Sequence, residues 1–213
     1  RRAVDPARTE ALKRAGPWLL AVWSTVALSV TVLYGHFAMD DFFITYRYAA
    51  NLAAGSGFVF NAGERVFGVT EPAQVIVLAL LRVLTRLSLP HLGTLVTGGG
   101  LIGLAWVLWR QSLRAGRPIA GALAGTLVAI QTFFWVCRGA GVMPGLALLA
   151  AAAALRHRPI LAGVLAGSAV WFRPEIVLGV AGLGLLLLLE ERHWRSLEER
   201  RWRSPRLLNF AAT

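Results

Sequence analysis

The sequence predicts an all-α fold, a polytopic transmembrane helix bundle of about six or seven spans with an amphipathic helix in its first outer loop. Hydrophobic residues make up 56% of the 213 residues. Charged residues make up only 15%, whereas an ordinary soluble domain carries about 25%. The apolar residues gather in runs, which are what a membrane helix requires. We expect one transmembrane domain over 1–213, forming the N-terminal part of a longer chain.

The positive charge lies at the ends of the apolar runs. The formal net charge is +11. Basic residues flank the first and last runs: Arg1, Arg2, Arg8, Lys13, Arg14, Arg192, Arg195, Arg200, Arg201, Arg203 and Arg206. This distribution follows the positive-inside rule and places the N-terminus in the cytoplasm. It argues against nucleic-acid binding, which needs a solvated basic surface.

The first predicted span is 17–37, and it places 38–71 outside as the first outer loop. In that loop, apolar residues at helical spacing predict an amphipathic helix over 41–54 on the membrane surface. The glycines at 55 and 57 end this helix. A short extended piece over 58–60 and a turn over 61–64 complete the loop.

Six further apolar runs follow, at 73–89, 92–109, 119–136, 142–155, 159–172 and 176–190. Breaks between them fall at positions that include Pro90, Pro118 and the Glu190-Glu191 pair. The glycines 98–100 either bend their helix or allow close packing. Residues 191–213 form a cytoplasmic basic tail. Successive loops of a multi-pass protein alternate between the two sides of the membrane. The segment 73–89, which carries Arg82 and Arg86, then has two possible outcomes: either it does not fully span the membrane, or one basic loop violates the charge bias.

Asp40 and Asp41 directly follow the first span, in a chain with only 11 acidic residues. One interpretation is a helix cap, because Asp is favoured at the N-cap and in the first turn. The other is a general base placed at a low-dielectric boundary. The sequence leaves both open.

Asp40, Arg47 and Asn51 are seven and four residues apart, which places them near one helical face. An acid, a guanidinium and an amide on one stripe suit a site that handles a hydroxyl and a phosphate. The alternative is a solvated polar face of a surface helix. Arg173 and Glu175 flank Pro174 between two apolar runs, either as an ion pair at a helix junction or as a functional pair.

The sequence shows no zinc spacing, and its one cysteine, Cys137, has no neighbouring ligand. We predict no cofactor, and the sequence leaves a divalent-metal requirement undecided.

The outer loop resembles the first outer loop of the GT-C superfamily of glycosyltransferases, closest to the branch that contains the mycobacterial terminal arabinofuranosyltransferase. The likeness rests on three strings: DDFFITYRYAANL at 40–52, GSGFVFNAGERV at 55–66 and GVTEP at 68–72. The triplet Arg173-Pro174-Glu175 is similar to a second, weaker motif of these proteins.

The resemblance implies a multi-pass enzyme of the bacterial inner membrane. It would transfer a sugar from a polyprenyl-phosphate donor to a glycan, lipid or protein acceptor on the outer face. The catalytic Asp of such families maps onto Asp40 or Asp41, with Asp40 favoured. Arg47 and Arg173 become candidates for the donor phosphate. The residues expected to shape the loop or touch the sugar are Asn51, Asn61 and Glu64.

Two other function classes are weighed against the enzyme. The first is a non-catalytic membrane scaffold or lipid-binding protein of an envelope-glycan pathway, which would follow if the chain ended at Thr213 and lacked part of the site. The second is a transporter, which would need ionisable residues along a midplane path, whereas the charges here lie mostly at the ends of the runs.

Overall fold

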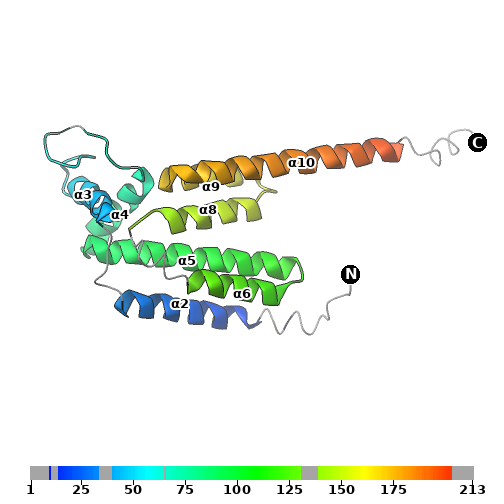
Figure 1. The fold of residues 1–213 in the computed structure, drawn as a ribbon, viewed down its shortest axis with the longest axis horizontal. Coiled ribbons are helices and arrows are strands. Elements are labelled where there is room, and N and C mark those ends of the chain that lie inside the picture. Colours follow the sequence, from blue (N-terminus) through cyan, green and yellow to red (C-terminus); the bar gives the residue numbers. More distant parts are fainter. Residues whose placement is uncertain (1–9, 11–13, 34–39, 65, 131–138, 203–213) are drawn as a thin grey trace, which may run out of the picture. The chain divides into compact units, whose positions relative to one another are not determined.

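The computed structural model describes residues 10, 14–33, 40–64, 66–130 and 139–202. This part of the chain holds eight α-helices and one 3-10 helix, and it contains no strand (Figure 1). The predicted all-α class is therefore confirmed for the described residues. The chain divides into two compact units, Arg1–Ile176 and Val177–Thr213.

In the first unit, five helices pack side by side: α2 (Gly16–Leu33), α5 (Leu89–Arg114), α6 (Pro118–Ala129), α8 (Val142–Ala154) and α9 (Pro159–Phe172). Helix α5 contacts α2, α6 and α8, and α9 packs on α8. Prolines lie in the first turn of α5, α6 and α9, where the missing N–H has no helical partner to lose. The predicted breaks at Pro90 and Pro118 are thus helix starts.

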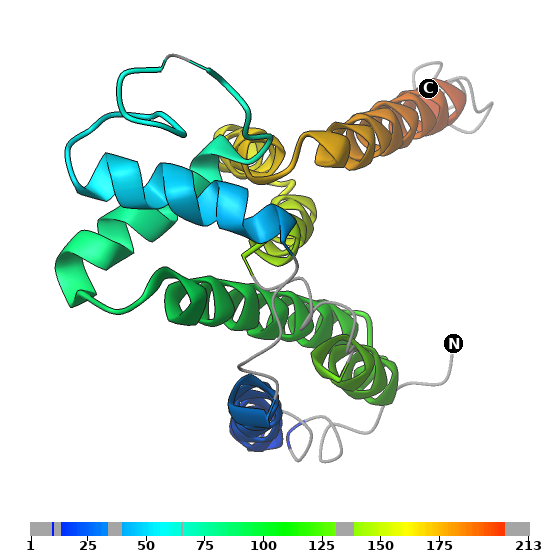
Figure 2. The ribbon, with the colours of Figure 1, turned by 60° about the vertical axis from the view of Figure 1, so that its left-hand side comes forward.

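The remaining two long helices of this unit, α3 (Asp41–Ala53) and α4 (Pro72–Thr85), lie at the end of the bundle where α2, α6 and α9 finish (Figure 1). Helix α3 packs on α4, and the chain between them arches back from the end of α3 to the start of α4 (Figure 2). Their shared core includes Phe42, Tyr46, Tyr48, Val75 and Leu78. The predicted helix over 41–54 is confirmed to within one residue.

The opposite end of the bundle gathers basic residues. A surface hollow there is lined by Arg114 from the end of α5 and by Arg156 and His157 from the α8–α9 connection. The α5–α6 and α8–α9 connections thus lie at the same end of the bundle. Basic side chains of two separate connections therefore meet at one end of the first unit.

One helix in the described part, α5, is long and apolar enough to cross a membrane. Its 26 residues extend for about 39 Å. Helix α4 has 14 residues and extends for about 21 Å, less than the roughly 30 Å of a hydrocarbon core. Helices α6, α8 and α9 have 12, 13 and 14 residues, so length does not distinguish α4 from them, and both outcomes for 73–89 stay open. A bundle of six or seven spans is not established by these lengths.

The second unit is one helix, α10 (Val177–Trp202), which follows the 3-10 turn η1 (Pro174–Ile176) of the first unit. The predicted break at Glu190-Glu191 is wrong, because α10 continues through both residues. Glutamate and arginine are good helix formers, so a change from apolar to charged residues does not interrupt the backbone hydrogen bonds. The predicted tail therefore begins within a helix, and residues 203–213 lie outside the described part.

The glycines 98–100 serve close packing. A methyl group on Gly100 would lie 2.5 Å from the nitrogen of Pro144 and 2.6 Å from the carbonyl carbon of Met143 in α8. A methyl group on the adjacent Gly99 would meet nothing within 4 Å. Of these two adjacent glycines, Gly100 is the one that the contact between α5 and α8 requires.

We predict that Gly100→Ala lowers the free energy of unfolding by about 1–3 kcal/mol, because α8 backbone atoms would have to move. Gly99→Ala is the matched control and should leave stability equal or raise it by up to about 1 kcal/mol, because Ala favours a helix. Thermal unfolding of both variants in detergent measures the difference. Equal midpoints for the two variants would refute close packing at Gly100.

Candidate functional site

The site begins at the start of α3, where the two predicted acids lie. Asp40 occupies the N-cap position but makes no side-chain capping hydrogen bond, and Asp41 lies in the first turn. Both side chains are exposed. The capping interpretation therefore describes the position of Asp40 but not the use of its carboxylate, which stays available for chemistry.

The predicted polar face of α3 holds the outer loop in place. Arg47 donates from Nε to the carbonyl of Phe60 at 2.9 Å and from Nη2 to Oδ1 of Asn61 at 2.9 Å. Asn51 donates from Nδ2 to the same Phe60 carbonyl at 2.8 Å and to that of Val59 at 2.9 Å. This face is thus occupied by the loop and is not simply solvated.

Asn61 links this pair to the last predicted residue, because its Nδ2 donates to Oε2 of Glu64 at 3.0 Å. The turn between them is closed by the Glu64 N–H, which donates to the Asn61 carbonyl at 3.1 Å. Gly63 has a φ of +88°, which the third position of such a turn requires. Arg47, Asn51, Asn61 and Glu64 are therefore brought together, and the predicted turn is confirmed.

Tyr48 also organises the loop, although the sequence analysis did not single it out. Its hydroxyl donates to the Val66 carbonyl at 2.5 Å and accepts from the Gly68 N–H at 2.8 Å. Its ring is fully buried and lies 5.3 Å from that of Phe58. The helical spacing of apolar residues that predicted α3 gave Tyr48 no role.

An open hollow of about 410 Å³ adjoins the polar face. Helix α3 supplies one wall, and the end of α4 with the start of α5 supplies the other; the lining residues are Phe43, Tyr46, Arg47, Ala50, Arg82, Ser88, Leu89 and Pro90. The α3 residues share one stripe of the helix. Asp40 extends that stripe by one turn, because it precedes Phe43 by three residues.

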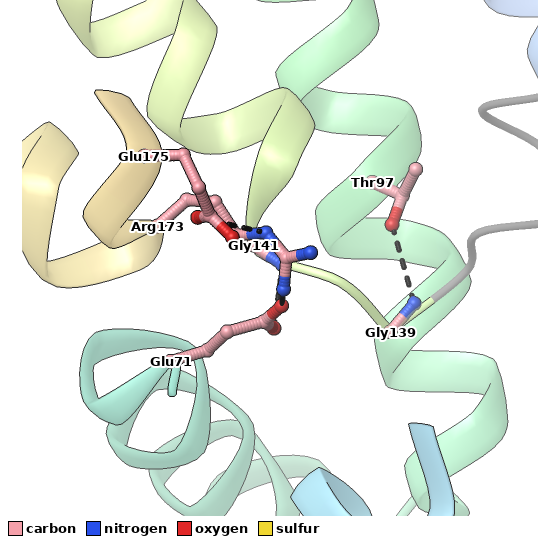
Figure 3. A network of polar contacts seen from close by, with 6 residues as sticks. All are labelled: Glu71, Thr97, Gly139, Gly141, Arg173 and Glu175. Carbon is pink, nitrogen blue, oxygen red and sulfur yellow. Dashed lines mark hydrogen bonds and ion pairs between the residues drawn. The ribbon is translucent and has the colours of Figure 1, made fainter. Parts of the chain in front are cut away.

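Arg173 lies in a separate network (Figure 3). Its Nη1 pairs with the Glu71 carboxylate, and its Nε lies 3.4 Å from Oε2 of Glu175. Glu71 also accepts a 2.8 Å hydrogen bond from the Gly141 N–H. Arg173 does not line the hollow that contains Arg47. The ion-pair interpretation of Arg173 and Glu175 therefore holds, with Glu71 as the additional and more buried partner.

Glu71 is the buried member of this network: its side chain is 4% exposed, against 30% for Arg173 and 67% for Glu175. Burial raises the pKa of the Glu71 carboxyl, although the Gly141 N–H and the Arg173 guanidinium oppose the rise. The folded protein thus binds this proton more tightly than the unfolded chain does. The stability it contributes is greatest below the ordinary pKa and falls as pH rises through the raised value.

Sequence reasoning missed two charged residues here. Glu71 was seen only as the last acid of a motif string, and its partners Gly141 and Arg173 are far away in the chain. Arg82 was seen only as a difficulty for the topology. An arginine within an apolar run was the available signal, because such charges are usually functional or paired. The described residues contain no cluster of three His, Cys, Asp or Glu side chains suited to a metal ion.

The chain is similar to the terminal beta-(1->2)-arabinofuranosyltransferase of Mycobacterium tuberculosis, with 32% identity over 219 aligned positions. The alignment covers 83% of this chain and 33% of that protein, so the chain spans about a third of the length of the curated relative it matches. No family model and no solved structure matches the sequence. The similarity indicates a relationship to a glycosyltransferase, the class of enzyme that the sequence analysis predicted.

We predict that Glu71→Ala lowers the free energy of unfolding by about 2–3 kcal/mol, because the Gly141 N–H and the Arg173 guanidinium lose their buried acceptor. Glu175→Ala removes the exposed acid from the same arginine and should cost less than about 1 kcal/mol. Denaturant unfolding in detergent compares the two. A larger loss for Glu175→Ala would contradict the assignment of Glu71 as the central partner.

Proposed function

We propose that the chain carries the outer catalytic loop of a GT-C type membrane glycosyltransferase. The reaction is transfer of a sugar from a polyprenyl-phosphate donor to a hydroxyl of a glycan, lipid or protein acceptor. One observation carries the proposal. The carboxylate of Asp40 makes no capping hydrogen bond, and Asp40 lies on the stripe of α3 that continues through Phe43 and Arg47 into the hollow. The similarity to an arabinofuranosyltransferase supports the same class of reaction.

The proposed chemistry needs one base and one group that stabilises the leaving phosphate. Asp40 accepts the proton of the acceptor hydroxyl while that oxygen forms a bond to the anomeric carbon of the sugar. The bond between the anomeric carbon and the phosphate oxygen breaks, and its electron pair stays on the phosphate. Arg47 stabilises the charge that develops there. Seven residues separate Asp40 from Arg47, an axial rise of about 10 Å.

The assignment favours Asp40 over its neighbour. Successive helical residues are rotated by about 100°, so Asp41 faces away from the stripe that lines the hollow. Its charge in the first turn of α3 stabilises the positive end of the helix. Asn51, Asn61 and Glu64 act on the loop, because their hydrogen bonds fix its main chain or the orientation of Arg47.

The proposed location is the outer face of a bacterial inner membrane, in a multi-pass protein with a cytoplasmic N-terminus. The charge difference between the two ends of the helix bundle supports it. Asp40 and Arg47 lie at one end, and Arg114, Arg156 and His157 gather at the other. Cytoplasmic loops carry the excess of basic residues, so the end with Asp40 faces outward.

We predict that Asp40→Asn lowers the rate of sugar transfer by about 10²–10⁴-fold, the usual contribution of a positioned general base. Asp41→Asn is the matched control, and it should retain most of the activity. The measurement is transfer of labelled sugar from a polyprenyl-phosphate donor by the full-length protein in membranes. Undiminished transfer by Asp40→Asn would refute the role of this residue. Absence of transfer by the unmodified protein would favour the non-catalytic scaffold.

A further inference from the structure

Two arginines from different helices face the same hollow. Arg47 belongs to α3 and Arg82 to the last turn of α4, and both are exposed side chains that line it. Among the residues that the structure describes, neither guanidinium forms an ion pair with a carboxylate, whereas Arg173 contacts two. Two like charges around one hollow repel each other unless an anion lies between them. The hollow is therefore electrostatically complementary to an anion.

Both guanidinium groups are held in place by bonds that do not neutralise them. Arg82 donates from Nη1 to the carbonyls of Arg86 and Leu87, at 2.9 and 2.6 Å. Arg47 is held by the Phe60 carbonyl and the Asn61 amide. Carbonyl and amide oxygens carry no formal charge, so each arginine keeps its full charge. A side chain that is already fixed loses less conformational freedom when a ligand binds.

The arrangement also leaves donors for a ligand. In the described part of the chain, Nε and Nη2 of Arg82 and Nη1 of Arg47 have no hydrogen-bond partner, because the bonds of these side chains use the other nitrogens. Guanidinium N–H groups match the geometry of phosphate oxygens. Asn61 stands between Arg47 and the Glu64 carboxylate, so Glu64 fixes the arginine without pairing with it directly.

Apart from Ser88, the rest of the hollow is lined by apolar and aromatic residues. Phe43 is 52% exposed, and its ring packs edge-on against that of Tyr46 at 5.7 Å. Leu89 and Pro90 complete the opposite wall. A free inorganic anion would gain nothing from these surfaces. A phosphate attached to a hydrocarbon chain would bury apolar area against them while its oxygens meet the arginines.

We infer that Arg82 is a second anion-binding residue, and that Arg47 and Arg82 together bind the phosphate of a lipid-linked phosphate ester in this hollow. The inference rests on the proposed function, since it identifies where the donor phosphate lies. It assigns that contact to Arg82 in place of Arg173, whose charge is matched by Glu71 and Glu175.

The test measures binding without transfer. The full-length protein in uncharged detergent is titrated with a polyprenyl phosphate, and the dissociation constant is taken from the ligand-induced shift of the thermal midpoint. Arg82→Gln should weaken binding roughly ten- to a hundredfold, as expected for the loss of a charge-assisted contact. Arg82→Lys keeps the charge but not the planar donors, so its affinity should lie between that of the unmodified protein and that of Arg82→Gln.

The matched control is Arg86→Gln. Arg86 lies four residues after Arg82 and carries the same charge, but its side chain does not line the hollow. It should bind like the unmodified protein. Each shift is referred to the midpoint of the same variant without ligand, so any loss of stability from the Arg82 hydrogen bonds is separated from loss of binding. Equal weakening by Arg86→Gln and Arg82→Gln would overturn the inference, because it would indicate a general effect of charge.

Two ligand comparisons identify the source of the anion. The corresponding polyprenol, which lacks the phosphate, should produce no shift that depends on Arg82. Inorganic phosphate at the same concentration should produce none either; an equal shift would overturn the lipid part of the inference.

Asp40→Asn separates this inference from the proposed function. It should bind polyprenyl phosphate normally. If it also transfers sugar normally, the role of Asp40 fails while the anion site stands. If Arg82→Gln binds as tightly as the unmodified protein, the anion site fails whatever Asp40 does.

Discussion

The carbonyl oxygen of Phe60 accepts two hydrogen bonds from α3, one from Nε of Arg47 and one from Nδ2 of Asn51. A carbonyl has two lone pairs, and here both serve one helix. This contact fixes the middle of the outer loop against the stripe that carries Asp40. It also fixes the arginine itself, whose guanidinium lies 4.9 Å from the centre of the Phe60 ring. The same hydrogen bonds therefore fix both the position of the outer loop and the orientation of the Arg47 guanidinium.

Three arginines of the first unit, Arg47, Arg82 and Arg173, fall into two electrostatic classes. Arg173 is matched by carboxylates, one of them buried, and so it holds segments of the chain together. Arg47 and Arg82 are held by uncharged oxygens and keep their charge for a ligand. The difference follows from the type of acceptor, because a neutral acceptor orients a guanidinium without cancelling its field. Sequence motifs do not distinguish these classes, since each shows only an arginine.

Local patterns account for most of what the sequence predicted. The helical spacing of apolar residues over 41–54 predicted α3, and the glycines predicted to end it, Gly55 and Gly57, have positive φ angles. Asp40, Arg47 and Asn51 shared a face because three positions on one helix have a fixed geometry. Glu64 and Asn61 came together through a four-residue turn. Each of these relations is contained within a short segment.

Relations between distant segments were beyond the reach of such patterns. The partners of Glu71 lie 70 and 102 positions away in the chain, and no periodicity connects them. The place of Arg82 in the hollow depends on the turn of the chain after α4. There Arg86 adopts a φ of +60°, and the start of α5 lies opposite α3 across the hollow. The continuation of α10 through two glutamates was missed for another reason: polarity was taken for a break, whereas helix propensity decides it.

The span between Glu71 and Arg173 has a consequence for biosynthesis. A ribosome releases the outer loop long before it releases Arg173, so Glu71 emerges without the guanidinium that it pairs with in the folded protein. Until α9 has been made and has packed on α8, Arg173 is not in place to pair with Glu71. A contact between residues so far apart in the chain can form only after both segments have been made. The loop that carries Asp40 therefore reaches its final anchorage only after the helices behind it have assembled.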